Sequence, residues 1–453
     1  MFLRSFLLSS ALFMAPSLTW SAVIHVYPDG SGDAPTIDAA YFMANPGDVV
    51  MLGPGTFFEH NIPNIAGVEL RSEMDDPNTT CIDAGQLGRC LLRAIGTIST
   101  STTIRGITFQ NGKSSSEGGL VIANGGRFEK CVFRNGSAPQ GGAAVHSEFA
   151  VGFSECLFES NSATVGGGAI WSSPDGFEGT EVFQCVFRSN STSGHGGAIY
   201  ADVLGPMSSP FQVRESRFEE NSAGGDGGGF YSTGVALQND SCIILLSHFL
   251  GNSAANGGGA RLQYQDVVIS TNFFDNEATK NGGALLLHRI QGSNYNYYDV
   301  FARNRAGMKG GAIFIDEWIS SYLDNSTFVS NEAPEGGHFY GDHTGTLHLN
   351  DSILAFAASG GAAGGSGSVA AGCSDVYGNV GGDFVGPLSD GFLLFSEDPL
   401  FCDAKNGDFT LQAESPCLSR PGCGGGYIGA HGQGCGVVSV DSKSWGAIKA
   451  MYR

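Results

Sequence analysis

A short segment near the end of the chain gathers residue types that bind metal ions. His338 follows a glycine pair, and Asp342 and His343 come soon after it. Imidazole and carboxylate groups bind divalent metals, and imidazole also titrates near neutral pH. We therefore name His338, Asp342 and His343 as candidate metal ligands. The alternative is that they are ordinary residues on the exposed face of a strand, because their spacing is not diagnostic of a metal site.

Two carboxylates near the start of the chain make calcium a candidate cofactor. They are the first and last residues of the segment 29–33, which reads Asp-Gly-Ser-Gly-Asp. Carboxylate oxygens are calcium ligands, but the segment lacks the spacing and the closing glutamate of an EF-hand loop. A tight polar turn is the alternative interpretation.

A group of aromatic residues offers a platform for a sugar or a protein partner, since rings supply large contact areas at binding surfaces. The group lies on neighbouring repeats and consists of Tyr295, Tyr297, Tyr298 and Trp318. The alternative is that these rings only cover turns at the surface.

Acidic residues in successive repeats raise the question of glycoside hydrolysis, which uses two carboxyl groups facing one cleft. Glu159, Arg188 and Glu219 each follow a repeated phenylalanine and alternate in sign. Opposite charges on neighbouring strands attract one another, so this pattern predicts a stabilising column of ion pairs. No pair of acids stands out as catalytic, and we assign no catalytic residue.

Except for the segment 29–33, these residues lie on or beside a sequence repeat. Each unit has a phenylalanine, an asparagine three residues later and then a glycine pair, with a period of 24 to 31 residues. A repeat with a period in this range indicates a solenoid. The clearest copies are Phe158 and Asn161, Phe187 and Asn190, Phe218 and Asn221, Phe249 and Asn252, Phe273 and Asn276, Phe301 and Asn304, and Phe328 and Asn331.

The composition of the units decides which solenoid forms. They are rich in glycine, serine and short apolar runs, which favour strands and turns over helices. Three short strands and three turns fill one unit, and stacked units place equivalent residues about 4.8 Å apart. We therefore predict an all-β, right-handed parallel β-helix, in which the phenylalanines stack inward and the asparagines form an amide ladder.

The chain divides into six predicted segments. Residues 1–22 have the charged start, apolar stretch and small residues of a signal peptide. A cap and first coil occupy 23–60, with a helix at 35–45 whose Ile37, Ala40 and Phe42 cover the open end of the solenoid. Repeats fill 61–358, a flexible Gly/Ala/Ser-rich loop 359–372, the final coils and a disulfide-prone cap 373–436, and a tail 437–453.

The eleven cysteines indicate an oxidising compartment. Cys131, Cys156 and Cys185 lie two residues before repeated phenylalanines, so they share the inward face and form either a ladder of thiols or a bridge. We predict bridges between Cys81 and Cys90 and among a C-terminal set consisting of Cys402, Cys417, Cys423 and Cys435.

The net charge of −21 makes nucleic acid and anionic lipid poor partners. No segment after residue 22 is apolar for long enough to span a bilayer as a helix. We expect a protein that is secreted or located at the cell surface, with an extracellular glycan or a surface protein as its partner.

The repeats resemble those of the polymorphic outer membrane proteins, most fully at 158–170, 187–199 and 301–313. The segment 36–57 is similar to the start of pectin-lyase-like β-helix proteins, and Gly194-His195-Gly196 resembles a short polygalacturonase motif without its supporting residues. The resemblance implies a β-helix but not one function, because this fold hosts many activities. We expect a non-catalytic protein in cell-surface adhesion, recognition or structure. The alternative is a polysaccharide lyase or glycoside hydrolase of the pectin-lyase-like class.

Overall fold

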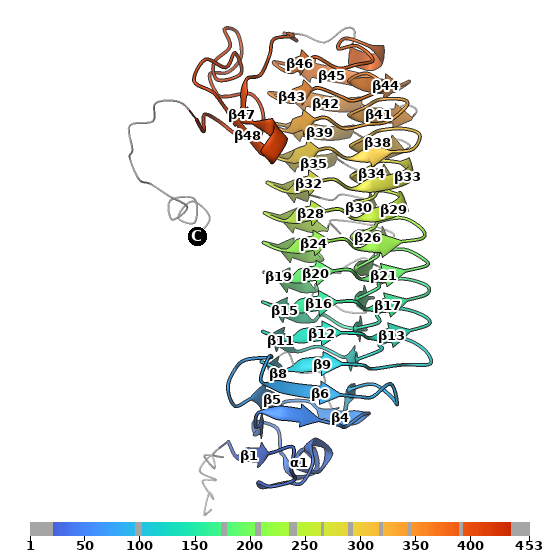
Figure 1. Cartoon of the computed structure of the whole chain (residues 1–453), viewed down its shortest axis with the longest axis vertical. Helices are drawn as coiled ribbons and strands as arrows, with labels where there is room; N and C mark the ends of the chain where they lie inside the picture. Colours follow the sequence, from blue (N-terminus) through green and yellow to red (C-terminus); the bar gives the residue numbers. More distant parts are fainter. Residues whose placement is uncertain are drawn as a thin grey trace, which may run out of the picture.

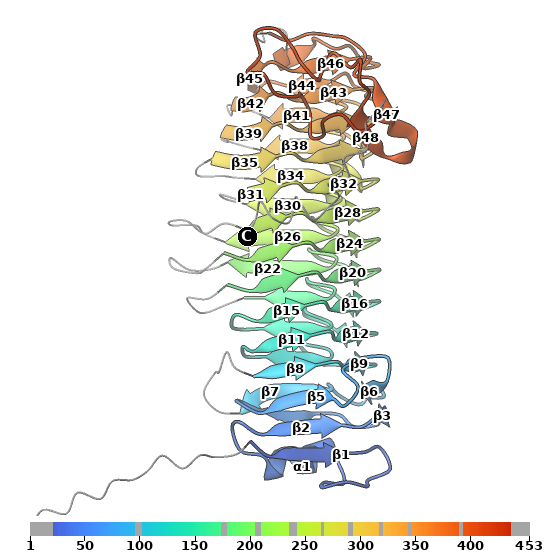
Figure 2. The ribbon, with the colours of Figure 1, turned by 90° about the vertical axis from the view of Figure 1, so that its left-hand side faces the viewer.

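The chain forms a long parallel β-solenoid of about 12 turns, shown in Figures 1 and 2. This computed structural model describes residues 21–95, 102–173, 179–203, 210–234, 242–263, 267–288, 293–316, 320–342, 346–388 and 393–435. Each turn, or coil, passes through short strands of three parallel sheets, which we name A, B and C, and many coils add a fourth strand in sheet D. The predicted all-β class and solenoid architecture are confirmed.

Sheets A and B carry the strands that precede and contain the repeated phenylalanine. Within the described residues, sheet A has fourteen strands: β1(Val23–Val26), β2(Val49–Leu52), β5(Glu69–Ser72), β8(Thr103–Arg105), β11(Arg127–Glu129), β15(Gly152–Ser154), β19(Glu181–Phe183), β23(Gln212–Arg214), β27(Ile243–Leu245), β31(Val267–Ile269), β35(Ser293–Tyr297), β39(Ser320–Asp324), β42(Thr346–Asn350) and β45(Ser368–Gly372). Sheet B has thirteen in the same part of the chain: β3(Gly55–Phe57), β6(Thr80–Asp83), β9(Thr108–Gln110), β12(Val132–Arg134), β16(Leu157–Glu159), β20(Val186–Arg188), β24(Arg217–Glu219), β28(His248–Leu250), β32(Asn272–Phe274), β36(Val300–Ala302), β40(Thr327–Val329), β43(Ile353–Ala355) and β46(Asp375–Tyr377).

Sheets C and D complete the coils. Sheet C has twelve strands in the described ranges: β4(Ile62–Ile65), β7(Leu91–Ile95), β10(Val121–Ala123), β14(Val145–Ser147), β18(Ile170–Ser172), β22(Ile199–Val203), β26(Phe230–Gly234), β30(Ala260–Gln263), β34(Leu285–His288), β38(Ile313–Asp316), β41(Phe339–Asp342) and β44(Ala363–Gly365). Sheet D has seven there: β13(Ser137–Ala138), β17(Ser162–Ala163), β21(Ser191–Thr192), β25(Ser222–Ala223), β29(Ser253–Asn256), β33(Glu277–Asn281) and β37(Arg305–Ala306).

The glycine pair lets the chain turn from sheet D into sheet C. Gly167 has a φ of +58°, and a Cβ atom there would lie 2.2 Å from the carbonyl oxygen of Ile170. Only glycine accepts such a position without strain. The same conformation recurs at Gly257, so the glycine run of that coil begins at Gly257.

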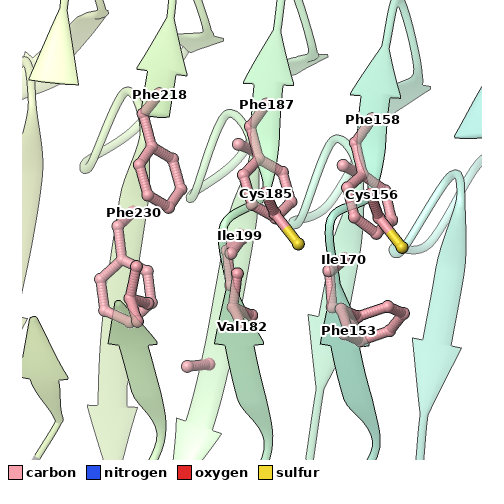
Figure 3. Packing of buried hydrophobic residues seen from close by; sticks show 14 of the residues in the cluster. Phe153, Cys156, Phe158, Ile170, Val182, Cys185, Phe187, Ile199, Phe218 and Phe230 are labelled. Carbon is pink, nitrogen blue, oxygen red and sulfur yellow. The ribbon is translucent and has the colours of Figure 1, made fainter. Parts of the chain in front are cut away.

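The interior is built from columns of identical side chains, seen in Figure 3. The rings of Phe158 and Phe187 stack with centroids 4.7 Å apart, and Phe187 stacks on Phe218 at 4.8 Å. Cys156 and Cys185 lie in the same core, and both are buried free thiols. Because the parallel strands pair in register, a residue that recurs at the same position of successive repeats forms a continuous column.

The asparagines form a second buried column. Asn190 donates its Nδ2 hydrogens to the carbonyl oxygen of Phe158 at 2.9 Å and to Oδ1 of Asn221 at 3.0 Å, and its backbone N–H donates to the same Oδ1 at 3.0 Å. This pattern runs from Asn161 to Asn331. Each amide therefore satisfies a backbone group and the amide of the next coil, where water is absent.

The N-terminal cap differs in detail from the prediction. Helix α1(Ile37–Met43) begins after Thr36, whose side chain accepts a hydrogen bond from Ala39 N at 3.1 Å. Ile37 and Ala40 are buried as expected, but Phe42 is 83% exposed and Tyr41 is buried instead. Phe42 was therefore the wrong plug residue, because it faces away from the coil that α1 covers.

The C-terminal cap folds back along the rod. The outer face of sheet B carries charges in the early coils, where Arg188 lies 3.0 Å from Glu219 and 3.7 Å from Glu159. In the later coils it turns apolar, as at Val300, and residues 395–430 of the cap pack there. The cap contains the antiparallel strands β47(Phe401–Asp403) and β48(Asp408–Leu411) and lies beside the later coils in Figure 1, and η1(Gly386–Leu388) and η2(Ala404–Asn406) are short 3-10 helices.

Two predictions about the C-terminal region and the cysteines need correction. Residues 359–372 are not a flexible loop but supply β44 and β45 of a further coil, where a Cβ at Gly364 would lie 2.9 Å from the Tyr340 ring. Small residues are needed because that ring lies over the strand. The bridge between Cys402 and Cys435 falls within the predicted C-terminal set, but Cys423 pairs with Cys373, which is outside that set, and Cys81, Cys90 and Cys417 are free.

Candidate ligand-binding face

The outer face of sheet C carries a column of large side chains that the repeat places in register. The sheet C strands from β10 to β38 point their first and third residues inward and their second outward, as at Ile170, Trp171 and Ser172. We call this set of outward residues the central column. From the early to the late coils it consists of Ile122, His146, Trp171, Tyr200, Tyr231, Arg261, Leu286, Phe314 and Tyr340.

Three aromatic rings stack in the middle of the column. The centroids of Trp171 and Tyr200 are 4.9 Å apart with a 43° angle between planes, and Tyr200 and Tyr231 are 4.9 Å apart at 22°. Carbon atoms in contact prefer separations of about 3.5–4 Å. Centroids 4.9 Å apart exceed this separation, so the rings are offset or tilted against one another, and Trp171 and Tyr200 are partly exposed to solvent.

Glycines in the preceding turns make room for these rings. A Cβ atom at Gly141 would lie 1.7 Å from Cε3 of Trp171, and one at Gly166 would lie 2.9 Å from Cδ2 of Tyr200. The rings thus lie across the turn of the preceding coil. In the next coil the corresponding turn position is His195, whose Nδ1 accepts a hydrogen bond from Asp226 N at 2.9 Å.

A buried arginine ends the aromatic stack. The guanidinium of Arg261 lies 4.6 Å from the centroid of the Tyr231 ring, and Nε lies 3.7 Å from Oδ2 of Asp226. Its NH1 donates to Ser232 O and to Gln263 Oε1, both at 3.1 Å. Arg261 is only 8% exposed, so its guanidinium group interacts with these neighbouring residues and hardly with solvent.

A second outward column, which we call the polar column, runs beside the first. It lies two residues after the central column and consists of Asp202, Thr233, Gln263, His288, Asp316 and Asp342, all partly exposed. Burial raises the pKa of Asp202 above its ordinary value. His288 Nδ1 lies 2.7 Å from Asp316 Oδ2, and the next strand pairs Asp316 with Asp342. The column therefore offers hydrogen-bonding groups along six successive coils.

The late end of the face is more enclosed. Leu286, Phe314 and Tyr340 pack together with exposures of 6%, 5% and 9%. Lys309 Nζ lies 4.3 Å from the Tyr340 centroid and 3.9 Å from Asp342 Oδ2. The ammonium group of Lys309 therefore interacts with both the Tyr340 ring and the Asp342 carboxylate.

The structure does not bring His338 and Asp342 together. His338 is fully buried and continues the amide ladder: Nδ1 lies 3.1 Å from Asn331 Nδ2, and Nε2 lies 2.9 Å from Asn379 Oδ1. Burial lowers the pKa of His338 to about 4, so the ring is neutral. The imidazole bridges a gap in the ladder, because Ala357 occupies the position of the repeated asparagine in the intervening coil.

A metal at His338 would have to break this ladder, since both ring nitrogens already have protein partners. Asp342 lies on the outer face beside Lys309, and His343 lies outside the described residues. Within the described ranges, no group of three or more histidine, cysteine and acidic side chains is arranged to hold a metal ion.

Other predicted site residues occupy different surfaces. In the segment 29–33, Asp29 Oδ1 accepts from Ser31 N at 2.9 Å, and Asp33 Oδ2 accepts from His25 N at 2.9 Å, which is the geometry of a polar turn. Tyr297 and Tyr298 belong to sheet A and the turn after it, Tyr295 lies on the same strand β35, and Trp318 lies outside the described residues. The ring centroids of His195 and Tyr231 lie 4.7 Å apart, and burial lowers the pKa of His195.

The central column has a signal that sequence reasoning missed. Its members stand two residues after the small residue that follows each glycine pair, as Trp171, Tyr200 and Tyr231 show. Reading the repeat for its shared motif hides this position, because its side chains vary from coil to coil.

Fold and sequence together define the class of this protein as a parallel β-helix repeat protein. Its repeats resemble those of one known family: residues 155–173 and 184–202 match the Chlamydia polymorphic membrane protein (Chlamydia_PMP) repeat. These two segments are successive coils and include Trp171 and Tyr200. A comparison with curated proteins gave no match. Among the described residues, no helix has the length and apolar character needed to cross a membrane.

Proposed function

We propose that this protein is an exported recognition rod, displayed at the cell surface or secreted, that uses the outer face of sheet C to adhere to an extracellular partner. The observation that carries the proposal is the row of Trp171, Tyr200 and Tyr231 on the outer side of sheet C, in which Trp171 and Tyr200 are partly exposed. Large rings in register on an exterior face are the residues that dominate binding surfaces. The match to the polymorphic membrane protein repeat supports surface display.

The rod geometry supports an extended partner. In-register strands carry the same face over many coils, so contacts repeat along the axis. Each contact is small, and adherence then comes from the number of coils engaged.

The test is binding of the labelled full-length protein to intact target cells, with a double variant, Trp171→Ala with Tyr200→Ala. Phe183→Ala is the matched control, because Phe183 is a partly exposed, outward aromatic residue on sheet A of the following coil. We expect the double variant to lose about tenfold or more in binding and the control to bind normally. Equal binding by all three proteins would overturn the proposal, as would the absence of the wild type from the exterior of producing cells under protease shaving.

A second candidate function is cleavage of a polysaccharide on the same face. It is favoured by Asp316 and Asp342, which lie in register on neighbouring strands with His288 on the strand before. Neighbouring strands lie about 4.8 Å apart, near the roughly 5–5.5 Å between the carboxyl groups of retaining glycosidases. Product analysis by mass spectrometry decides it: shortened chains formed by the wild type and not by Asp316→Asn would establish cleavage.

A further inference from the structure

The central and polar columns present a periodic set of contacts that suits a periodic ligand. Their residues recur once per coil, and the stacked rings are 4.9 Å apart. A globular protein partner without internal repeats has no such period, whereas a linear polysaccharide offers one similar unit after another. The length of one pyranose unit is comparable to this spacing, so a chain lying along the rod would meet equivalent groups in successive coils.

The kinds of side chain also fit a sugar. Trp171 and Tyr200 present slanted, partly exposed rings, which pack against the apolar face of a pyranose. Beside them the polar column offers a carboxylate at Asp202, a hydroxyl at Thr233 and an amide at Gln263. Such groups accept from and donate to sugar hydroxyls.

The charges of the face favour an uncharged glycan. The polar column contains three acids and no lysine or arginine, and the whole chain carries −21. Two cations beside it are engaged: Arg261 with Asp226 and Tyr231, and Lys309 with Asp342 and Tyr340. The three carboxylates of the column would repel an anionic polymer.

We propose that the outer face of sheet C binds a linear, uncharged polysaccharide whose chain runs along the axis of the solenoid. The rings of Trp171 and Tyr200 form the stacking platform, and Asp202, Thr233 and Gln263 bind the hydroxyl groups. This inference rests on the proposed recognition function and names its ligand class.

The test uses the full-length protein and neutral polysaccharides, namely cellulose, chitin, mannan and a soluble β-glucan, with polygalacturonate and heparin as polyanions. Affinity is measured by pull-down and by affinity electrophoresis, and then by calorimetry on oligosaccharides of increasing length. We expect at least one neutral polymer to bind, with an affinity that rises as sugar units are added. Trp171→Ala with Tyr200→Ala, and separately Asp202→Ala, should weaken binding about tenfold, whereas Phe183→Ala should not.

Asp202→Ala keeps the test valid if the double variant does not fold, because Asp202 is a partly exposed residue on the outer face. Binding of polyanions alone, binding unaffected by all variants, or no binding to any neutral polymer would each overturn the inference. If target-cell binding still requires Trp171 and Tyr200 but survives glycosidase treatment of those cells, the ligand is a protein. That result would remove the glycan inference and leave the proposed recognition function standing.

Discussion

Replacement of one asparagine in the buried ladder tests how the repeat stabilises the solenoid. Asn221→Ala removes the acceptor used by Asn190 N and Asn190 Nδ2, at 3.0 Å each, and the donors to Phe187 O and Asn252 Oδ1, at 2.9 Å each. Asn190 Nδ2 keeps Phe158 O as a partner. Asn190 N then loses its partner in the buried interior, whereas Phe187 O still belongs to the parallel ladder between β20 and β24.

A buried polar group without a partner costs about 1–3 kcal/mol, so the loss of the partner of Asn190 N in Asn221→Ala should destabilise the protein by at least about 1–3 kcal/mol. The assay is equilibrium unfolding in urea, followed by circular dichroism and by hydrogen exchange of the coils on either side. Ser222→Ala is the control, because Ser222 is the exposed next residue and should cost less than about 0.5 kcal/mol. Equal unfolding of the two variants would refute the reasoning that the ladder satisfies buried backbone groups.

Three further predictions concern a buried aspartate, the histidine of the ladder and a disulfide of the cap. Burial raises the pKa of Asp299 well above its ordinary value, so the free energy of unfolding contributed by the protonated carboxyl group is complete below about pH 4 and is lost as the pH rises. Asp299→Ser should therefore stabilise the protein at pH 7, and identical pH–stability curves for the two proteins would contradict this. His338→Ala opens the ladder and should destabilise the protein by about 1–3 kcal/mol in thermal unfolding, whereas an unchanged midpoint would show that the imidazole bridges nothing. Cys373→Ser with Cys423→Ser removes a bridge across 50 residues and should speed proteolysis within the cap, not within the coils, with equal cleavage rates as the contrary result.

The repeat was predictable because it obeys a simple rule of parallel stacking. Phe158, Phe187 and Phe218 recur with the same neighbours, so their columns follow from the spacing alone. The period also places Asn161 and its equivalents on one line. Sequence reasoning reached the solenoid because every coil repeats the same local choices.

The pairing of cysteines was less accessible. Cys373 and Cys423 approach only because the cap folds back onto the last coils, with Cα atoms 5.6 Å apart. That docking depends on the apolar outer face of sheet B around Val300, which looks unremarkable in a single repeat. Contacts between the cap and the coils are non-periodic, and a periodic pattern carries no information about them.

The candidate sites illustrate the same limit. His338 was marked because it breaks the motif, yet it restores the ladder between Asn331 and Asn379, which lie 48 positions apart in the chain. The residues of the central column, in contrast, vary in type and only become a surface once the coils are placed in register. Variable positions in a solenoid therefore need to be read down the stack as well as along the chain.

The claim that the outer face of sheet C is the recognition surface is tested most directly by site-specific cross-linking. A photoreactive group is attached to cysteine in Asp202→Cys, on this face, or in Glu181→Cys, on the outer face of sheet A. We predict a cross-link to the target-cell ligand from position 202 and none from position 181. A cross-link from position 181 alone, or equal yields from both positions, would contradict the account.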